Sequence, residues 1–277
     1  MKRSSKELKR YAKLALEGRY GIAIMGVLAA FGINLLGNLL AGNLFTGEFL
    51  PTMIMSQIFL FILSLVTGIL SAGLYYMFLN MARDREFGLG DLLYFFRNHP
   101  DRVIVAGFVL ALIDLVVSIP YYWYSYTVIP GNTLEAQVEW MGRSMELMLL
   151  SIVLNVIVTL PFVMTYFLMA DHLDMGGIEA LKASAAMMKG HKGRYLLMQI
   201  SFIPLLFLSI FTLYIALLWI VPYMQMTVTM FYRDLLGELD QDIYEDHREN
   251  KSAWDQDDFN SEASNVMCGT SDFNSRA

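Results

Sequence analysis

The chain has 277 residues, 56% of them hydrophobic and 17% charged, and a formal net charge of −6. Ordinary soluble domains are less hydrophobic than this, so the composition indicates a membrane protein, and we expect no nucleic-acid partner. The single cysteine, Cys268, excludes an internal disulfide and a cysteine-based metal cluster.

Residues 1–19 form a basic, amphipathic segment. Ser4 and Glu7 have the spacing of a capping box, and apolar residues recur on one face of the helix that follows. We expect this helix to lie on the cytoplasmic membrane surface, with its basic side chains near anionic lipid head groups. These side chains are Lys6, Lys9, Arg10, Lys13 and Arg19. The alternative is that the segment only anchors the topology.

Residues 20–236 hold the apolar segments. Four of them are each long enough to cross a hydrocarbon core of about 30 Å. They cover residues 21–45, 53–82, 103–124 and 145–170, and the first lacks a clear cleavage site, so we expect it to remain in the protein. The last apolar stretch, residues 195–232, would extend roughly 57 Å as one helix and must turn near Thr212 to Ile215. It forms two short spans, 195–212 and 215–232, or a re-entrant hairpin.

The basic residues fix the expected topology. On this six-span scheme, all of the 20 Lys and Arg residues except Arg143 fall on one side of the membrane. Because positively charged loops stay in the cytoplasm, both termini are predicted to be cytoplasmic. The predicted location is therefore the cell (cytoplasmic) membrane, crossed several times by the chain. The oligomeric state does not follow from the sequence.

The chain also has a threefold repeat, each unit being a short surface helix, a basic or glycine-rich joint and a pair of spans. The joints are residues 17–20, 97–102 and 189–195, and the third adds Lys189, Lys192 and Arg194 to the expected lipid-head contacts. The second spans of the three pairs end alike, at Ala82-Arg83-Asp84, Ala170-Asp171 and Tyr232-Arg233-Asp234. We therefore predict an all-α, six-helix membrane bundle with short amphipathic interfacial helices on its cytoplasmic side.

Several short stretches carry a resemblance to a known family. They are Glu7-Leu8-Lys9, Gly18-Arg19-Tyr20, Tyr166-Phe167-Leu168-Met169-Ala170-Asp171, Glu179-Ala180-Leu181-Lys182-Ala183-Ser184, Met187-Met188-Lys189-Gly190-His191-Lys192-Gly193, Ser201-Phe202-Ile203, Leu218-Trp219-Ile220-Val221-Pro222-Tyr223 and Phe231-Tyr232-Arg233-Asp234-Leu235. Over roughly residues 1–236 the chain resembles the uncharacterised integral membrane proteins of Gram-positive bacteria catalogued as domain of unknown function 975. It departs from them at the last turn, where Tyr214 and Ala216 stand in place of the family's usual glycine. The resemblance implies fold and location, and it implies no activity.

The sequence contains none of the common nucleophile, phosphate-binding or metal-helix motifs. Gly88-Leu89-Gly90-Asp91 resembles the Gly-x-Gly-Asp motif of intramembrane aspartyl proteases, which need a second aspartate, here Asp114. The favoured interpretation is that Asp91 is the N-cap of the helix that follows. His172 lies near Asp171 and Asp174, but one histidine with two acids indicates interfacial charge, not a metal site. We predict no catalytic residue, no cofactor and no metal ligand.

Asp114 is the one ionisable residue expected near the middle of a span. A carboxylate at that depth costs about 2.5 to 3.5 kcal/mol, so it should meet a partner, a watery cavity or a proton. Its candidate partners are Asn34 and Asn38 on the first span and Asn155 on the fourth. Two interpretations remain open: a proton- or cation-coupled site, or a protonated side chain that bonds two helices together. The second is favoured because no other buried charge is expected.

Pro161 and Pro222 occupy similar places in the fourth and sixth spans. Each removes a backbone hydrogen bond, which favours either a packing kink or a discontinuous helix of the kind found in transporters. The tail, residues 237–277, is acidic and poor in aliphatic residues, so we expect it to be a disordered, cytoplasmic appendage.

The function favoured by the sequence is that of an integral membrane protein without enzymatic activity, structural or regulatory in role. Its expected partners are the lipid bilayer and anionic head groups, and a membrane or cytosolic protein partner is compatible with this role. The alternative is a small transporter or channel subunit that uses Asp114. A membrane-embedded enzyme ranks third because no paired catalytic residues are found.

Overall fold

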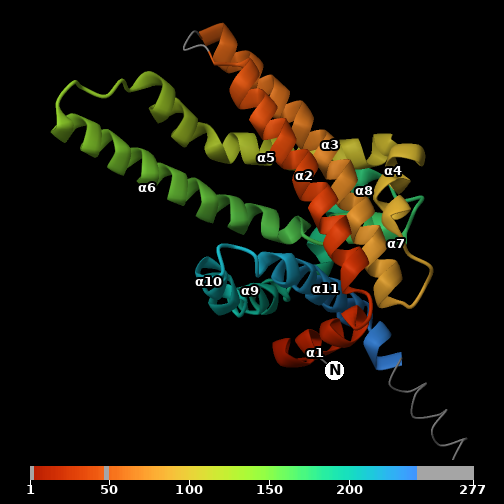
Figure 1. Cartoon of the computed structure of the whole chain (residues 1–277). Helices are drawn as coiled ribbons and strands as arrows, with labels where there is room; N and C mark the ends of the chain where they lie inside the picture. Colours follow the sequence, from red (N-terminus) through yellow and green to blue (C-terminus); the bar gives the residue numbers. More distant parts are fainter. Residues whose placement is uncertain (1–2, 47–49, 242–277) are drawn as a thin grey trace, which may run out of the picture. The chain divides into compact units, whose positions relative to one another are not determined.

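The computed structural model describes residues 3–46 and 50–241, and within these ranges every regular element is a helix (Figure 1). The chain divides into two compact units. One contains the described residues of 4–232, and the other contains Arg3 and residues 233–241. In the smaller unit, Arg3 donates to Asp234 at 3.2 Å and to the Leu239 carbonyl at 2.7 Å. Most of the acidic tail and Cys268 lie outside the described residues.

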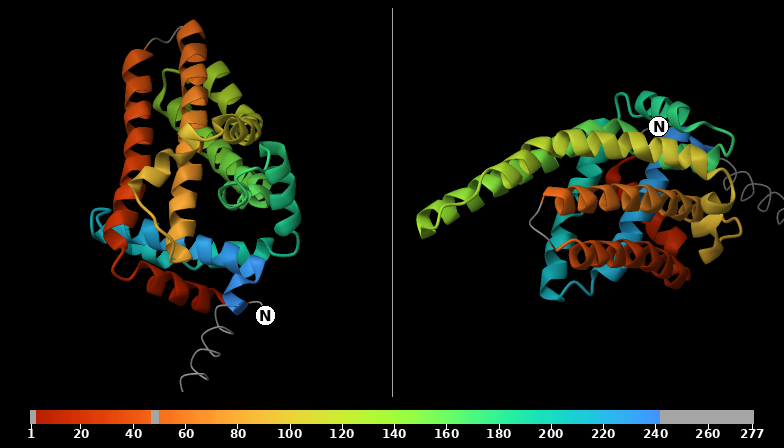
Figure 2. Two further views of the ribbon diagram at one scale, coloured as in Figure 1. Left: turned by 90° about the vertical axis from the view of Figure 1, so that its right-hand side faces the viewer. Right: turned by 90° about the horizontal axis from the view of Figure 1, so that it is seen from above.

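The first unit of the repeat consists of α1 (Ser5–Leu16), α2 (Tyr20–Leu44) and α3 (Leu50–Ala82). The predicted capping box at α1 is confirmed, since the Glu7 carboxylate accepts from the Ser4 N–H at 2.7 Å and the Ser4 hydroxyl accepts from the Glu7 N–H at 3.4 Å. Helices α2 and α3 lie side by side as a hairpin, drawn in red and orange in Figure 2. Gly26 and Gly37 of α2 contact side chains of α3, so the lack of a Cβ permits close packing.

The second unit consists of η1 (Leu89–Leu93), α4 (Tyr94–Arg97), α5 (Pro100–Thr127), α6 (Leu134–Thr159), η2 (Leu160–Phe162) and α7 (Thr165–Asp171). Helices α5 and α6 form its hairpin. The predicted span 145–170 is not one continuous α-helix, because α6 ends at Thr159, the 3-10 helix η2 follows, and α7 begins at Thr165. Pro161 lies in η2, so the α-helical hydrogen-bond pattern is broken around it.

The third unit consists of α8 (Gly177–Met187), α9 (Lys192–Ile200), α10 (Ile203–Phe211) and α11 (Leu217–Leu236). The turn between α10 and α11 includes the predicted Thr212 to Ile215. Leu213 and Tyr214 adopt left-handed backbone conformations there, with φ of 51° and 65°. A side chain at such a φ strains the backbone, and glycine at these positions would relieve that strain.

Five helical stretches of the described residues are long and apolar enough to cross a membrane. They are Tyr20–Leu44, Ile54–Ala82, Pro100–Thr127, Leu134–Asp171 and Lys192–Phe211. Their apolar side chains are widely exposed, as with Leu36 (61%) and Val116 (62%), which a protein surrounded by lipid permits. The sixth predicted span lies in α11, which is not one of the five. It contains Gln225, Thr227 and Thr229, and it includes the charged Arg233 and Asp234 near its end.

Each predicted joint contributes one arginine that contacts its own hairpin. In each unit, the arginine of the joint lies against the end of the second helical arm. Arg19 donates to the Met81 carbonyl at 3.0 Å, and Arg102 donates to the Leu173 carbonyl at 2.8 Å. The guanidinium of Arg194 lies 5.0 Å from the centre of the Phe231 ring. Each arginine therefore closes its own hairpin.

Buried side chains gather where the three second arms end. The Phe167 ring stands 4.5 Å from that of Tyr75 and 5.2 Å from that of Tyr232. The Asp171 carboxylate accepts two hydrogen bonds from Arg83, at 2.6 and 3.0 Å, and one from the Tyr232 hydroxyl at 3.0 Å. The ends of α3, α7 and α11 thus meet at one largely buried carboxylate.

Candidate functional site

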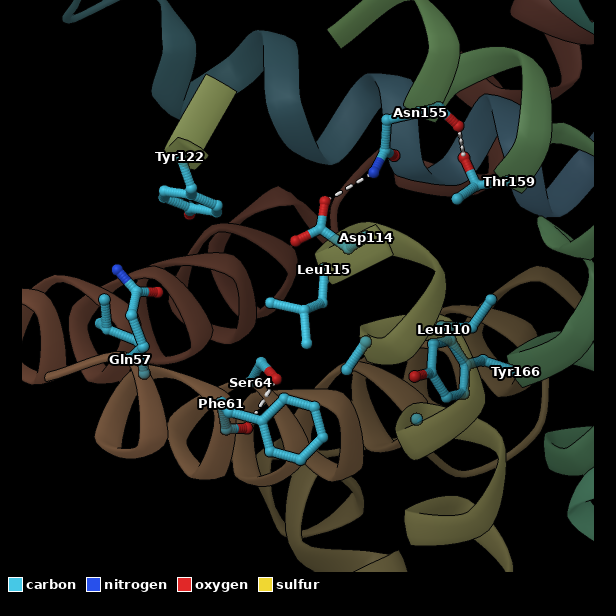
Figure 3. Close-up of a pocket in the computed structure, with 13 residues that line it drawn as sticks. Gln57, Phe61, Ser64, Leu110, Asp114, Leu115, Tyr122, Asn155, Thr159 and Tyr166 are labelled. Carbon is cyan, nitrogen blue, oxygen red and sulfur yellow. Dashed lines mark hydrogen bonds between the residues drawn. The ribbon is translucent and has the colours of Figure 1, made fainter. Parts of the chain in front are cut away.

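A cavity of about 400 Å³ lies between α3, α5, α6 and α7 (Figure 3). Its walls are partly apolar, with polar groups contributed by every one of these elements. Polar side chains in the lining include Gln57, Ser64, Asp114, Tyr122, Asn155 and Tyr166. Because four separate elements supply the lining, the cavity depends on the tertiary fold and not on one local motif.

Asp114 projects into this cavity from the middle of α5. The residue lies roughly 20 Å from either end of the helix at 1.5 Å per residue. Its side chain is exposed, and the Asn155 amide donates to one carboxylate oxygen at 2.5 Å. The other oxygen points away from Asn155, on the side of the cavity where Tyr122 lies (Figure 3). The carboxylate is therefore both bonded across two helices and open to the cavity.

A second cavity, of about 340 Å³, adjoins Asp114 between α5 and α6. Ser118, Tyr121 and Ser151 contribute polar groups to it, and Asp114 and Asn155 line both cavities. The two hydrogen-bonded residues Asp114 and Asn155 therefore belong to the walls of both cavities.

The broken fourth arm borders the first cavity. Thr159, the last residue of α6, and Tyr166 of α7 both line it. The break is held by Ser184 of α8, whose hydroxyl accepts from the Met164 N–H at 3.1 Å and donates to the Pro161 carbonyl at 2.8 Å. A neighbouring helix therefore satisfies the backbone groups that the break releases.

Residues 1–238 match the model of a family described as "Protein of unknown function (DUF975)". The chain belongs to this family. The predicted family is thereby confirmed. No curated protein and no solved structure matches the chain. The family description names no reaction or ligand.

The structure joins one of the three predicted asparagines of this DUF975 chain to Asp114. Asn155 bonds to it, whereas Asn34 and Asn38 pair with each other on α2, where the Asn38 amide donates to the Asn34 side-chain oxygen at 2.9 Å. Sequence reasoning did not identify Tyr122, Tyr166 or Gln57. Tyrosines and glutamines within apolar segments can be recognised in the sequence. The sequence does not show which face of each helix meets the cavity.

Asp91 does not act as the N-cap that the sequence suggested. It lies at the third position of η1, and its carboxylate accepts from the Gly88 N–H at 3.2 Å. It still stabilises the start of the helix, and it does not line the cavity with Asp114. No group of three or more potential metal ligands occurs among the described residues.

Three of the predicted lipid-head residues contact the protein. Lys9 donates to the Ser201 carbonyl at 3.0 Å and lies 3.8 Å above the Phe202 ring, and its partial burial lowers its pKa. Arg19 and Arg194 close their hairpins as described above. The remaining five are exposed and stay predictions for lipid contact: Lys6, Arg10, Lys13, Lys189 and Lys192.

Proposed function

We propose that the protein acts as a small transporter or channel subunit, with Asp114 as the group that its cargo or coupling ion contacts. The observation that supports this most directly is the exposure of Asp114 to a cavity although it lies mid-helix. A carboxylate at that depth is costly and marks substrate or ion pathways in membrane proteins. Dry packing around Asp114 would have favoured the structural role instead.

The broken fourth arm supports the same proposal. Discontinuous helices form the binding sites of many secondary transporters, because they bring helix ends into the middle of the membrane. Here the C-terminal end of α6 borders the cavity. The C-terminal end of a helix carries partial negative charge, which adds to that of Asp114 and favours a cation.

The proposed topology has six spans, with α11 as the sixth, in the cytoplasmic membrane of a Gram-positive bacterium. Both termini are cytoplasmic, and α1, α4 and α8 lie at the interface on that side. The distribution of Lys and Arg supports this orientation. We assign the protein no enzymatic activity, because Asp114 has no second acidic residue beside it in either cavity.

A structural or regulatory role is the second candidate. The Asn155 to Asp114 hydrogen bond favours it, because such a bond between α5 and α6 stabilises a hairpin by itself. In that case the protein would organise the bilayer or a membrane partner, and the Asp114 side chain would have no contact with water.

Cysteine accessibility in native membranes separates the two candidates. In a Cys268→Ser background, single cysteines at Leu110, Asp114 and Ser118 lie on one face of α5 and line the cavities. A cysteine at Val116 lies on the opposite face and is the matched control. The transport proposal expects a membrane-impermeant thiol reagent to label the first three and spare the control. Protection of all four positions would leave Asp114 as a buried interhelical bond.

A further inference from the structure

The charge of the cavities limits what they can bind. Asp114 is the one charged residue in the lining of either cavity. A single carboxylate without a basic neighbour attracts one positive charge. It matches a monovalent cation and repels anions. The site therefore offers little to phosphates, carboxylates or other acidic ligands.

The walls of the two cavities also contain aromatic rings. Phe61, Tyr122 and Tyr166 line the cavity that holds Asp114 (Figure 3), and Tyr121 lines the adjoining one. The faces of such rings attract cations through their quadrupoles, and they do so best for cations that shed water easily. Tyr122 lies two helical turns from Asp114 on α5, so the ring and the carboxylate share one face of the helix.

A divalent metal ion would be poorly balanced in charge here. The lining has one carboxylate, and its other side-chain oxygens are neutral: those of Gln57, Ser64, Tyr122, Asn155, Thr159 and Tyr166. No cluster of three metal-binding side chains occurs in the described part of the chain. The volume of about 400 Å³ exceeds that of a bare ion and lies in the range of small-molecule sites, roughly 300 to 1,000 Å³. An ammonium group with an apolar body matches both the charge and the walls.

We propose that the cavity at Asp114 binds a small organic monocation, an amine or quaternary ammonium compound with an apolar body. The carboxylate of Asp114 balances its charge, and the rings of Tyr122, Tyr166 and Phe61 surround its apolar part. This inference rests on the proposed function, since it requires that Asp114 be reachable from water.

Binding of benzyltrimethylammonium tests the proposal. The purified full-length chain in detergent is titrated with this compound in an isothermal calorimeter, with sodium and potassium chloride as comparison titrants. We expect saturable binding of one molecule per chain and no comparable signal from the salts. Asp114→Asn should abolish binding, and Tyr122→Leu should weaken it about 5- to 30-fold. Tyr124→Leu makes the same change on the same helix outside the cavity lining, and it should leave the affinity unchanged.

Each result has a distinct meaning when it is combined with labelling at positions 110 and 118. If both cysteines label but benzyltrimethylammonium does not bind at millimolar concentration, the ligand class is wrong and the transport proposal stands. If both are protected and no binding occurs, both proposals fail. If Asp114→Asn still binds the compound, the proposed binding site is wrong. It is also wrong if Tyr122→Leu and Tyr124→Leu weaken binding equally. Gel filtration shows whether each variant is folded. If Asp114→Asn does not fold, the comparison of Tyr122→Leu with Tyr124→Leu still tests the proposed site.

Discussion

Ser184→Ala is expected to destabilise the break between α6 and α7. The Ser184 side chain is fully buried, and its hydroxyl bonds the Met164 N–H and the Pro161 carbonyl at once. With alanine at this position, the buried Met164 N–H and the buried Pro161 carbonyl lose their hydrogen bonds to the hydroxyl. An unsatisfied buried group costs about 1–3 kcal/mol, so the free energy of unfolding should fall by about 2–4 kcal/mol.

The measurement is the free energy of unfolding of the purified protein in mixed micelles, from titration with a denaturing detergent. Ser209→Ala is the matched control, because Ser209 is also buried but its hydroxyl donates to the Leu206 carbonyl of its own helix. Loss of such a bond leaves the helix intact and should cost about 1 kcal/mol or less. The difference between the two variants isolates the contribution of the break.

A loss at Ser184→Ala no larger than that at Ser209→Ala would refute the reasoning. It would mean that other groups or water satisfy the backbone at the break. The cavity would be affected as well, because Thr159 and Tyr166 on either side of the break line it. We therefore also expect Ser184→Ala to change cysteine labelling at position 110.

Three further changes follow from contacts described above. Arg83→Leu leaves the Asp171 carboxylate without its two charged hydrogen bonds and should lower the free energy of unfolding by about 3–5 kcal/mol. Gly73→Ala should lower it by about 1–3 kcal/mol, because a Cβ at Gly73 would lie against the backbone of Leu92. Tyr214→Gly should raise it by about 1 kcal/mol, since Tyr214 has a φ of 65°. The same detergent titration measures all three.

Matched controls accompany the first two changes. Arg143→Leu removes an arginine from an exposed pair with Glu146 and should change stability by at most about 1 kcal/mol. Gly142→Ala places a Cβ in open space and should be neutral or slightly stabilising. Equal effects of Arg83→Leu and Arg143→Leu would show that the Asp171 cluster is not a stabilising centre. A destabilising Tyr214→Gly would show that the turn is not strained.

The sequence predicted the features that depend on near neighbours in the chain. The Ser4–Glu7 capping box involves residues three apart, so its spacing was sufficient. The all-helical class and the apolar segments followed from composition and run length. Asn155 was among the predicted partners of Asp114 because both are polar residues within apolar helices.

Features that depend on which helices are neighbours could not be predicted. Hydropathy does not say which face of a helix meets another, so Asn34 and Asn38 ranked with Asn155 although they pair with each other. Pro161 indicated an irregularity, but the break also needs Ser184, which is 23 residues away. The similar endings at residues 83 and 171 were visible, whereas their contact required the fold.

The arginine contacts at the joints bear on how the chain is made. Because Arg19 and Arg102 bond to residues of their own hairpins, each hairpin has all the groups for its closure as soon as its second arm has been synthesised. Domains and their parts generally assemble in the order of synthesis. Asp171, by contrast, needs Arg83, made long before it, and Tyr232, made 61 residues after it. The full set of hydrogen bonds to the Asp171 carboxylate therefore forms only once the third hairpin has joined the first two, so it is present only in the completely assembled protein.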